Sequence, residues 1–97
     1  QPIPTFPHPK RDLAFLISRE VEVQQMMRVM RATDPLVRNI EWFDTYMGKG
    51  VDEDKKSVAF HLTFGSNDRT LETAEVDTVL ERVKAAMAGA FDASVRS

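Results

Sequence analysis

Hydrophobic and polar positions alternate along two stretches of the chain. Residues 57–64, SVAFHLTF, carry an apolar side chain at every second position, and residues 11–18, RDLAFLIS, place Leu13, Phe15 and Ile17 on one face. A repeat of two is that of a β-strand, whose successive side chains point to opposite faces. Both stretches are therefore predicted to be strands with one face in the core.

Two further strands are predicted from composition and position. Residues 37–47, VRNIEWFDTYM, are rich in the aromatic and β-branched residues that favour strands. Residues 92–97, DASVRS, are long enough for a short last strand. Residues 48–56, which contain two glycines, are predicted to form a hairpin loop, and residues 65–72 a second loop.

Two other stretches repeat their apolar positions every three or four residues, which predicts amphipathic helices. The stretches are residues 20–33 and 73–91, and their apolar positions are Val23, Met26, Met27, Met30, Val76, Val79, Leu80, Val83 and Met87. The first helix is expected to end at the sequence TDP, because the residue before a proline avoids helical dihedral angles.

The predicted order β-α-β-β-α-β packs most simply as a ferredoxin-like α+β fold, with a four-stranded antiparallel sheet and both helices on one face. Residues 11–97 are assigned to this domain. Residues 1–10, QPIPTFPHPK, are expected to be an extended lead-in, because proline disfavours helices and central strands.

One face of such a sheet is left without helices. Strand alternation directs Ser57, Ala59, His61 and Thr63 to this open face. Phe43 is expected to share the core face, which places Trp42, Asp44 and Tyr46 on the open face as well. A β-bulge between Trp42 and Tyr46 would change this assignment.

The composition of the 97-residue chain is that of one globular domain. It has no cysteine, which excludes disulfides and thiolate metal sites and fits a cytoplasmic protein. No apolar run approaches the roughly 20 residues of a membrane span, and no signal peptide is expected. Because the chain begins with Gln1, it is expected to be a piece of a longer protein.

The net charge of −2 argues against tight non-specific binding to nucleic acids, and DNA is not an expected partner. The charge is uneven, however. Basic residues gather near the first strand and the central loops, while acidic residues dominate the stretch from Glu72 to Glu81. A locally basic edge on a mildly acidic domain is therefore expected.

The first candidate for a binding site combines Asp44, Tyr46 and Ser57. An exposed aromatic ring can stack on a nucleobase, which contributes about 1–3 kcal/mol per base. A carboxylate beside it accepts hydrogen bonds from the edge of the base, and a hydroxyl donates or accepts. The alternative is purely structural: Tyr46 closes the strand end, and Asp44 pairs with a neighbouring lysine.

Other candidates flank these three. Trp42 offers a second stacking surface, unless it packs under a loop. Lys49, Lys55 and Lys56 are candidate phosphate ligands, although charges near a hairpin tip are usually only solvated. His61 is expected to be a surface residue of the open face.

Nothing in the sequence predicts catalysis or a metal. Gly48 and Gly50 do not have the spacing of a phosphate-binding loop. His8 and His61 are far apart and belong to no metal-ligand motif. No serine has the sequence context of an activated nucleophile.

Three segments carry a resemblance to a known family. They are FPHPKRDLAFLI, WFDTYMGKGVDEDKKSVAFHLTF and NDRTLETAEVDTVLERV. Together they resemble the ferredoxin-fold anticodon-binding domain at the C-terminus of the bacterial phenylalanine–tRNA ligase β subunit. In that family the pattern runs FPxxRRD, FDxYxGxGVxxGKKSLAxxLTF and DRTLTDEEV. The likeness covers nearly the whole chain, with the segments in the same order.

The resemblance implies that the domain contacts the anticodon stem-loop of the phenylalanine tRNA. It also implies that Asp44, Tyr46 and Ser57 read the first anticodon base, a guanine. The wider tRNA-binding set that we expect adds residues for phosphates and for the open face: Lys49, Lys55, Lys56, Arg69, Trp42 and His61.

The resemblance places catalysis elsewhere. In the family, the reaction with ATP, magnesium and phenylalanine belongs to other domains and to the α subunit, in a tetramer of two α and two β subunits. No cofactor is expected in this domain, whose role would be to position the tRNA.

Three departures from the family pattern stand out. Lys10 replaces an arginine, which removes bidentate phosphate geometry. Asp54 replaces a glycine at the hairpin tip. Glu72 replaces the threonine that would form a capping box with Glu75, so Thr73 is expected to cap the second helix one residue late.

Two other functional classes remain open at the level of the sequence. One is a small-molecule regulatory module on the same fold. The other is a structural module that only packs against the rest of a large enzyme, and it would have an apolar open face.

Overall fold

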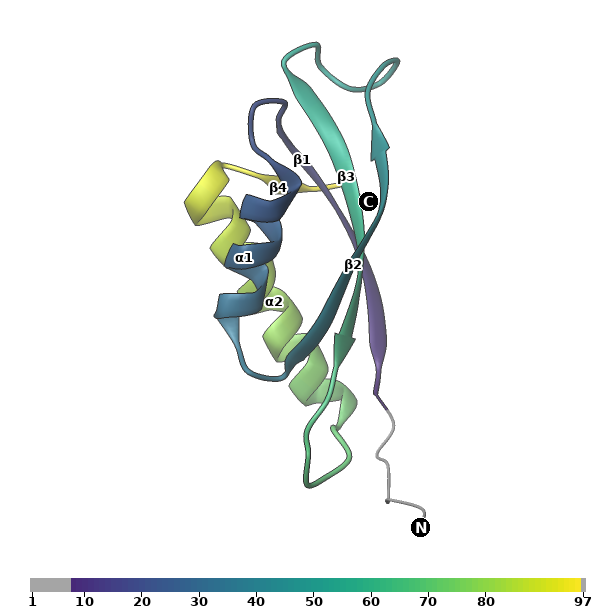
Figure 1. Ribbon diagram of the computed structural model, residues 1–97, viewed down its shortest axis with the longest axis vertical. Helices are drawn as coiled ribbons and strands as arrows, with labels where there is room; N and C mark the ends of the chain where they lie inside the picture. The colour runs from purple at the N-terminus through teal and green to yellow at the C-terminus, as the bar shows by residue number, and fades with distance from the viewer. Residues whose placement is uncertain (1–7, 97) are drawn as a thin grey trace.

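The computed structural model describes residues 8–96. Figure 1 shows the six elements in chain order, each labelled at its place in the fold. They are β1 (Lys10–Ser18), α1 (Val23–Thr33), β2 (Val37–Tyr46), β3 (Lys55–Phe64), α2 (Thr73–Phe91) and β4 (Ser94–Val95). The predicted elements are confirmed in number and order. The largest shift of a boundary is that of α1, which begins three residues later than predicted.

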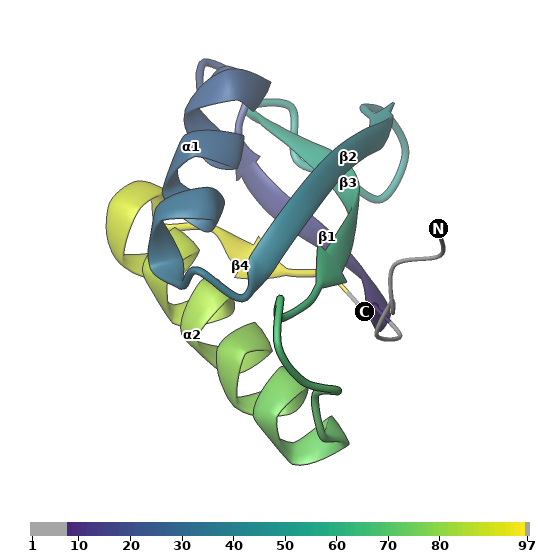
Figure 2. The ribbon, with the colours of Figure 1, turned by 60° about the horizontal axis from the view of Figure 1, so that its bottom comes forward.

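The four strands form one sheet in the order β2-β3-β1-β4, and every neighbouring pair is antiparallel. Both helices cover the same face of this sheet (Figures 1 and 2). The fold is therefore the ferredoxin-like α+β arrangement that the sequence predicts. Most of the predicted lead-in, residues 1–7, lies outside the described residues, and Lys10 already belongs to β1.

The core lies between the sheet and the helices. There the apolar side chains of the strands pack against the apolar faces of the two helices. The fully buried side chains come from every layer: Phe15, Ile17, Met26, Met30, Val58, Phe60, Leu62, Phe64, Val76, Val83 and Met87. Burying a Phe, Ile or Met side chain contributes roughly 1.5–3 kcal/mol. This packing fixes the strand register, because a slip by one residue would turn the apolar side chains to water.

The register of β2 corrects one prediction from the sequence. Trp42 lies opposite Phe60, Asp44 lies opposite Ala59, and Phe43 is the extra residue of a β-bulge between them. Phe43 is 48% exposed and its ring stacks on His61, so its predicted place in the core is wrong. Trp42 shares the helix-facing side of the sheet with Phe60, so its predicted place on the open face is wrong as well.

The start of α2 corrects a second prediction. The N-cap is Glu72 rather than Thr73, which is the first residue of the helix. The Glu75 carboxylate accepts a hydrogen bond from the backbone N–H of Glu72 at 3.1 Å, and a second from Arg69 Nη1 at 2.5 Å. These bonds, that of Arg69 first, hold the pKa of the Glu75 carboxyl below its ordinary value. Glutamate thus serves at a position where the family pattern has threonine.

Candidate nucleic-acid interface

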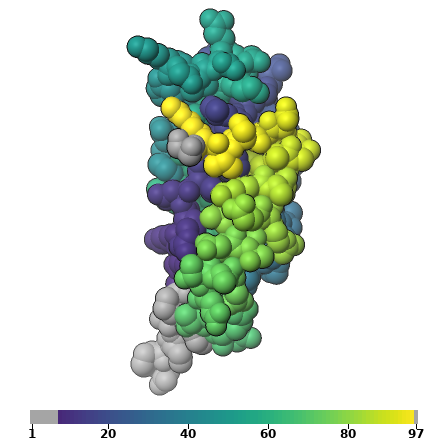
Figure 3. Space-filling model, turned by 180° about the vertical axis from the view of Figure 1, so that it is seen from behind, coloured from purple at the N-terminus to yellow at the C-terminus, as the bar shows by residue number. Residues whose placement is uncertain are grey.

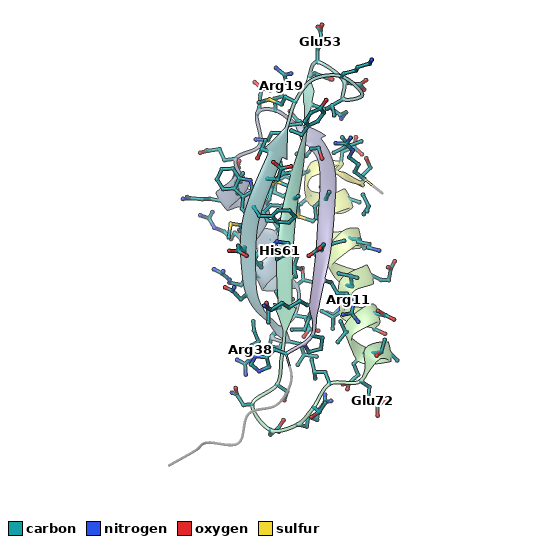
Figure 4. All side chains as sticks on the ribbon, turned by 90° about the vertical axis from the view of Figure 1, so that its right-hand side faces the viewer. Arg11, Arg19, Arg38, Glu53, His61 and Glu72 are labelled. Atoms are coloured by element: carbon teal, nitrogen blue, oxygen red, sulfur yellow. The ribbon has the colours of Figure 1, made fainter. Side chains whose placement is uncertain are left out.

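The helix-free face of the sheet is mostly polar and is built from rows of side chains that lie side by side on β2, β3 and β1. Figure 4 views this face directly, with no helix in front of it and with His61 near its middle. Strand pairing gives four rows from one end to the other: Asn39–Thr63–Lys10, Glu41–His61–Asp12, Asp44–Ala59–Ala14 and Tyr46–Ser57–Leu16. The bulge at Phe43 keeps Asp44 and Tyr46 on this face.

Tyr46 ends β2 and is fixed by the hairpin that follows. Its hydroxyl donates a hydrogen bond to the carbonyl oxygen of Lys49 at 2.8 Å, yet the residue stays 38% exposed. Gly48 and Gly50 adopt positive φ angles of 142° and 90°, which glycine tolerates far better than other residues. The structural role that the sequence suggests for Tyr46 is therefore met, while part of the side chain remains accessible.

Asp44 and Ser57 lie beside Tyr46 with different exposure. Asp44 is exposed, and within residues 8–96 it forms no ion pair, so the predicted alternative of a lysine partner is not found there. Ser57 is 6% exposed and lies directly opposite Tyr46 on one side and Leu16 on the other. The three candidates thus form one cluster: an acceptor, an aromatic ring and a recessed hydroxyl.

Arg96 joins this cluster, although the sequence analysis does not single it out. Its backbone N–H donates to the carbonyl oxygen of Ala14 at 2.7 Å, and its guanidinium lies over the Tyr46 ring, 5.4 Å from the centroid. In Figure 3 the yellow C-terminal residues lie next to the teal β2–β3 hairpin. A ferredoxin-like strand order would have predicted that Arg96 lies near the open face, because β4 pairs with β1 in this structure.

The basic residues near the hairpin divide between the two faces. Lys55 has the same strand parity as Ser57 and belongs to the open face, whereas Lys56 pairs with the buried Ile17 and belongs to the other. Lys49 lies exposed in the hairpin loop. Arg19, at the same end of the sheet (Figure 4), donates from Nε to the carbonyl oxygen of Lys55 at 3.2 Å. Three cations and Arg96 therefore surround the cluster.

Two predicted RNA ligands are not brought to the cluster. Arg69 lies in the loop after β3, at the end of the sheet opposite Tyr46, where it pairs with Glu75. Trp42, on the helix-facing side of β2, donates from its indole Nε1 to Thr45 Oγ1 at 2.8 Å. His61 lies on the open face but two rows away from Tyr46.

A hollow of ≈ 550 Å³ lies over α1, away from the cluster of Asp44, Tyr46 and Ser57. It is lined by Gln24, Met27, Arg28, Arg31 and Ala32. It holds no acid, thiol or imidazole that could act in acid–base, nucleophilic or metal chemistry. Among residues 8–96, no group of three or more His, Cys, Asp or Glu side chains is placed to hold a metal ion. No helix in the same range is long and apolar enough to cross a membrane.

The strand order and the position of both helices define a ferredoxin-like α+β domain with one open sheet face. The chain belongs to the family of ferredoxin-fold anticodon binding domains, whose family model matches residues 4–96. The resemblance that the sequence motifs indicate is thereby confirmed at the level of the family.

Individual relatives point the same way. The chain is 44% identical over 97 residues to the phenylalanine–tRNA ligase β subunit of Salinibacter ruber, and 39% identical over 98 residues to that of Synechococcus elongatus. It is 45% identical over 78 residues to that of Dehalococcoides mccartyi. These matches cover 99%, 100% and 80% of this chain, but only 12%, 12% and 10% of the relatives.

Proposed function

We propose that the chain binds the anticodon stem-loop of a phenylalanine tRNA on its open sheet face and positions the tRNA for aminoacylation by other domains. The observation that carries this proposal is the cluster of Asp44, Tyr46 and Ser57 on one face, at the positions that the family motif assigns to reading a base. Family membership supplies the class of RNA, and the relatives' name supplies the amino acid.

Each member of the cluster has a role that its chemistry supports. The Tyr46 ring stacks on the base. The Asp44 carboxylate accepts hydrogen bonds from N–H groups on the edge of the base, as carboxylates do when they recognise nucleobases. Ser57 is nearly buried beside Tyr46, so its hydroxyl could donate to or accept from the base only where the base lies directly against the sheet.

The cations around the cluster suit the backbone of the same nucleotides. Lys49, Lys55 and Arg19 lie at the hairpin end of the sheet, and Arg96 lies over the Tyr46 ring. They would neutralise phosphates on either side of the stacked base. Arg69 and Lys56 have no part in this arrangement, because one lies at the far end of the sheet and the other on the opposite face.

The wider assembly is part of the same proposal. The chain matches only about an eighth of the length of its relatives, so the remaining partners would be the rest of a β subunit and an α subunit, in the cytoplasm. ATP and magnesium would bind to those parts rather than to this domain. The polar rows of the open face disfavour the alternative of a module that only packs against other protein.

Titration of the chain with the anticodon stem-loop of a phenylalanine tRNA, followed by fluorescence anisotropy, tests the proposal. Tyr46→Ala is expected to weaken binding by about 1–3 kcal/mol, the contribution of stacking one base. Tyr46→Phe keeps the ring and should bind nearly as well as the wild type. Asp77→Asn, at an exposed position of α2, is the control. Equal affinity of the wild type and Tyr46→Ala would remove this site from the proposal.

A further inference from the structure

A second hollow, of ≈ 360 Å³, lies on the open face at a distance from the cluster of Asp44, Tyr46 and Ser57. It is lined by Lys10, Asp12, Asn39, Glu41, His61 and Thr63, which make up the two rows of the sheet farthest from Tyr46. The function proposed above uses none of its carboxylates. The hollow combines an imidazole, an amide, a hydroxyl and one amine with two acids, which is a set suited to recognition by hydrogen bonding.

The imidazole of His61 is held from two directions. Its Nδ1 lies 2.5 Å from Asp12 Oδ1, a contact in which the carboxylate accepts. One face of the ring stacks on Phe43, with centroids 3.7 Å apart and planes inclined by 3°. His61 lines the hollow, whereas Phe43 does not. The stacked pair is thus a preorganised flat surface, and a planar ligand in the hollow would continue the stack on the other face of His61.

The charges of the hollow decide what such a ligand can be. Asp12 and Glu41 outnumber Lys10, so a phosphate would meet net repulsion. Glu41 is exposed, and within residues 8–96 it forms no ion pair. Carboxylates recognise nucleobases by accepting hydrogen bonds from exocyclic amino groups, and asparagine amides contact adenine in the same way. A planar group with an amino substituent fits better than an anion.

We infer that this hollow is a second base subsite, in which an unpaired base bearing an exocyclic amino group stacks on His61 and donates hydrogen bonds to Glu41 and Asp12. The inference rests on the proposed function, because it assigns the subsite to another nucleotide of the same RNA loop. The chain would then recognise two bases of the loop: one at Tyr46, and a second at the hollow lined by Glu41 and Asp12.

The spacing of the two positions constrains the RNA. Ser57 and His61 are four residues apart on β3, which corresponds to roughly 13 Å at a strand rise of about 3.3 Å per residue. Bases stacked on each other are separated by only about 3.4 Å per nucleotide. The loop must therefore be splayed to fill both positions, as single-stranded RNA loops are when proteins read their bases.

The test is a set of binding titrations with the anticodon stem-loop, in which Glu41→Gln is compared with the wild type, Tyr46→Ala and the control Asp77→Asn. Glutamine keeps the shape of the side chain and one acceptor oxygen but removes the negative charge, so a charge-assisted hydrogen bond becomes a neutral one. Because hydrogen bonds to charged groups are roughly twice as strong as neutral ones, loss of the charge should weaken binding about fivefold to tenfold. Without a contact to a base, the same change would leave affinity equal or slightly raised, because it removes a negative charge near the RNA.

The RNA supplies the matching half of the experiment. Each unpaired loop base with an amino group is replaced in turn by an analogue without one, such as purine for adenine. At one position, removal of the amino group should weaken binding to the wild type more than binding to Glu41→Gln. Normal or tighter binding by Glu41→Gln, with binding by Tyr46→Ala weakened, would overturn the second subsite and leave the proposed function intact. No response to either variant would overturn both.

Discussion

Asp44 is an exposed acid on a surface that is proposed to bind an anion, and it forms no ion pair within residues 8–96. A carboxylate in that position repels phosphates, so it lowers affinity for the RNA backbone in general. It can still favour one base, because guanine presents an N1–H and an N2 amino group to a carboxylate that accepts from both. The acid therefore adds affinity only for a loop that presents guanine at this position, and this difference is a source of specificity.

A double substitution isolates this contact. Replacing the first anticodon guanosine by inosine removes the N2 amino group, and Asp44→Ala removes its acceptor. Each single change should weaken binding by about 1–3 kcal/mol, the usual value of one base contact. The two together should cost little more than Asp44→Ala alone, because that substitution already deletes the hydrogen bond from the N2 amino group that inosine lacks.

Equilibrium titration of the four protein and RNA combinations gives the coupling energy directly. Ser66, which hydrogen-bonds to Asp68 in the loop after β3, offers Ser66→Ala as a control far from the cluster. Strictly additive losses for Asp44 and inosine would contradict the assignment of Asp44 to the edge of the base.

At the scale of the elements, the bulge in β2 determines which side chains the RNA would meet. Simple alternation from Phe43 as a core residue gives the correct face for Asp44 and Tyr46 and the wrong one for Trp42 and Phe43. The sequence could not locate the bulge, because it arises where two residues of β2 pair with the single residue Phe60. The Phe43–His61 stack depends on that bulge and was not predictable for the same reason.

Local patterns specified the remaining elements well. The predicted range of α2, residues 73–91, is the observed one, since its apolar stripe and the loop before it are both clear in the sequence. The candidates Asp44, Tyr46 and Ser57 were found because a short motif holds them. Arg96 was missed, because its contact with Tyr46 depends on three strand pairings: β4 with β1, β1 with β3, and β3 with β2.

The N-terminus of α2 makes folding sensitive to acid. The pKa of the Glu75 carboxyl is lower in the folded chain than its ordinary value, chiefly because Arg69 donates to it. Its stabilising contribution is therefore present above the ordinary carboxyl range and is lost as the pH falls through the lowered pKa. The wild type should be more stable than Glu75→Gln near neutral pH, and the difference should shrink as the pH falls below the ordinary range of carboxyl groups.

Urea unfolding of both proteins across this pH range measures the effect. Asp77→Asn on the same helix is the control, since Asp77 forms no ion pair within residues 8–96. A difference between the wild type and Glu75→Gln that stays constant from neutral to acidic pH would show that the charge of Glu75 does not stabilise α2.

On the scale of the whole molecule, the two sides of the sheet have separate tasks. The helices and the apolar strand positions supply stability on one side, so the residues of the open face are free to be polar. The hairpin end of that face holds Tyr46 with its cations, and the middle holds His61 with its two flanking acids. An RNA loop bound along the strands as proposed would place one base at Tyr46, among the cations, and a second base at His61 further along the face.

The most direct test of this account is a map of backbone amide NMR shifts of the chain during titration with the anticodon stem-loop at low salt. The account predicts shifts that cluster at residues 44–49, 55–61 and 94–96, with little change on the outer surface of α2. Shifts that gather on the helices instead, or their absence at saturating RNA, would contradict the claim that the open sheet face is the RNA-binding surface.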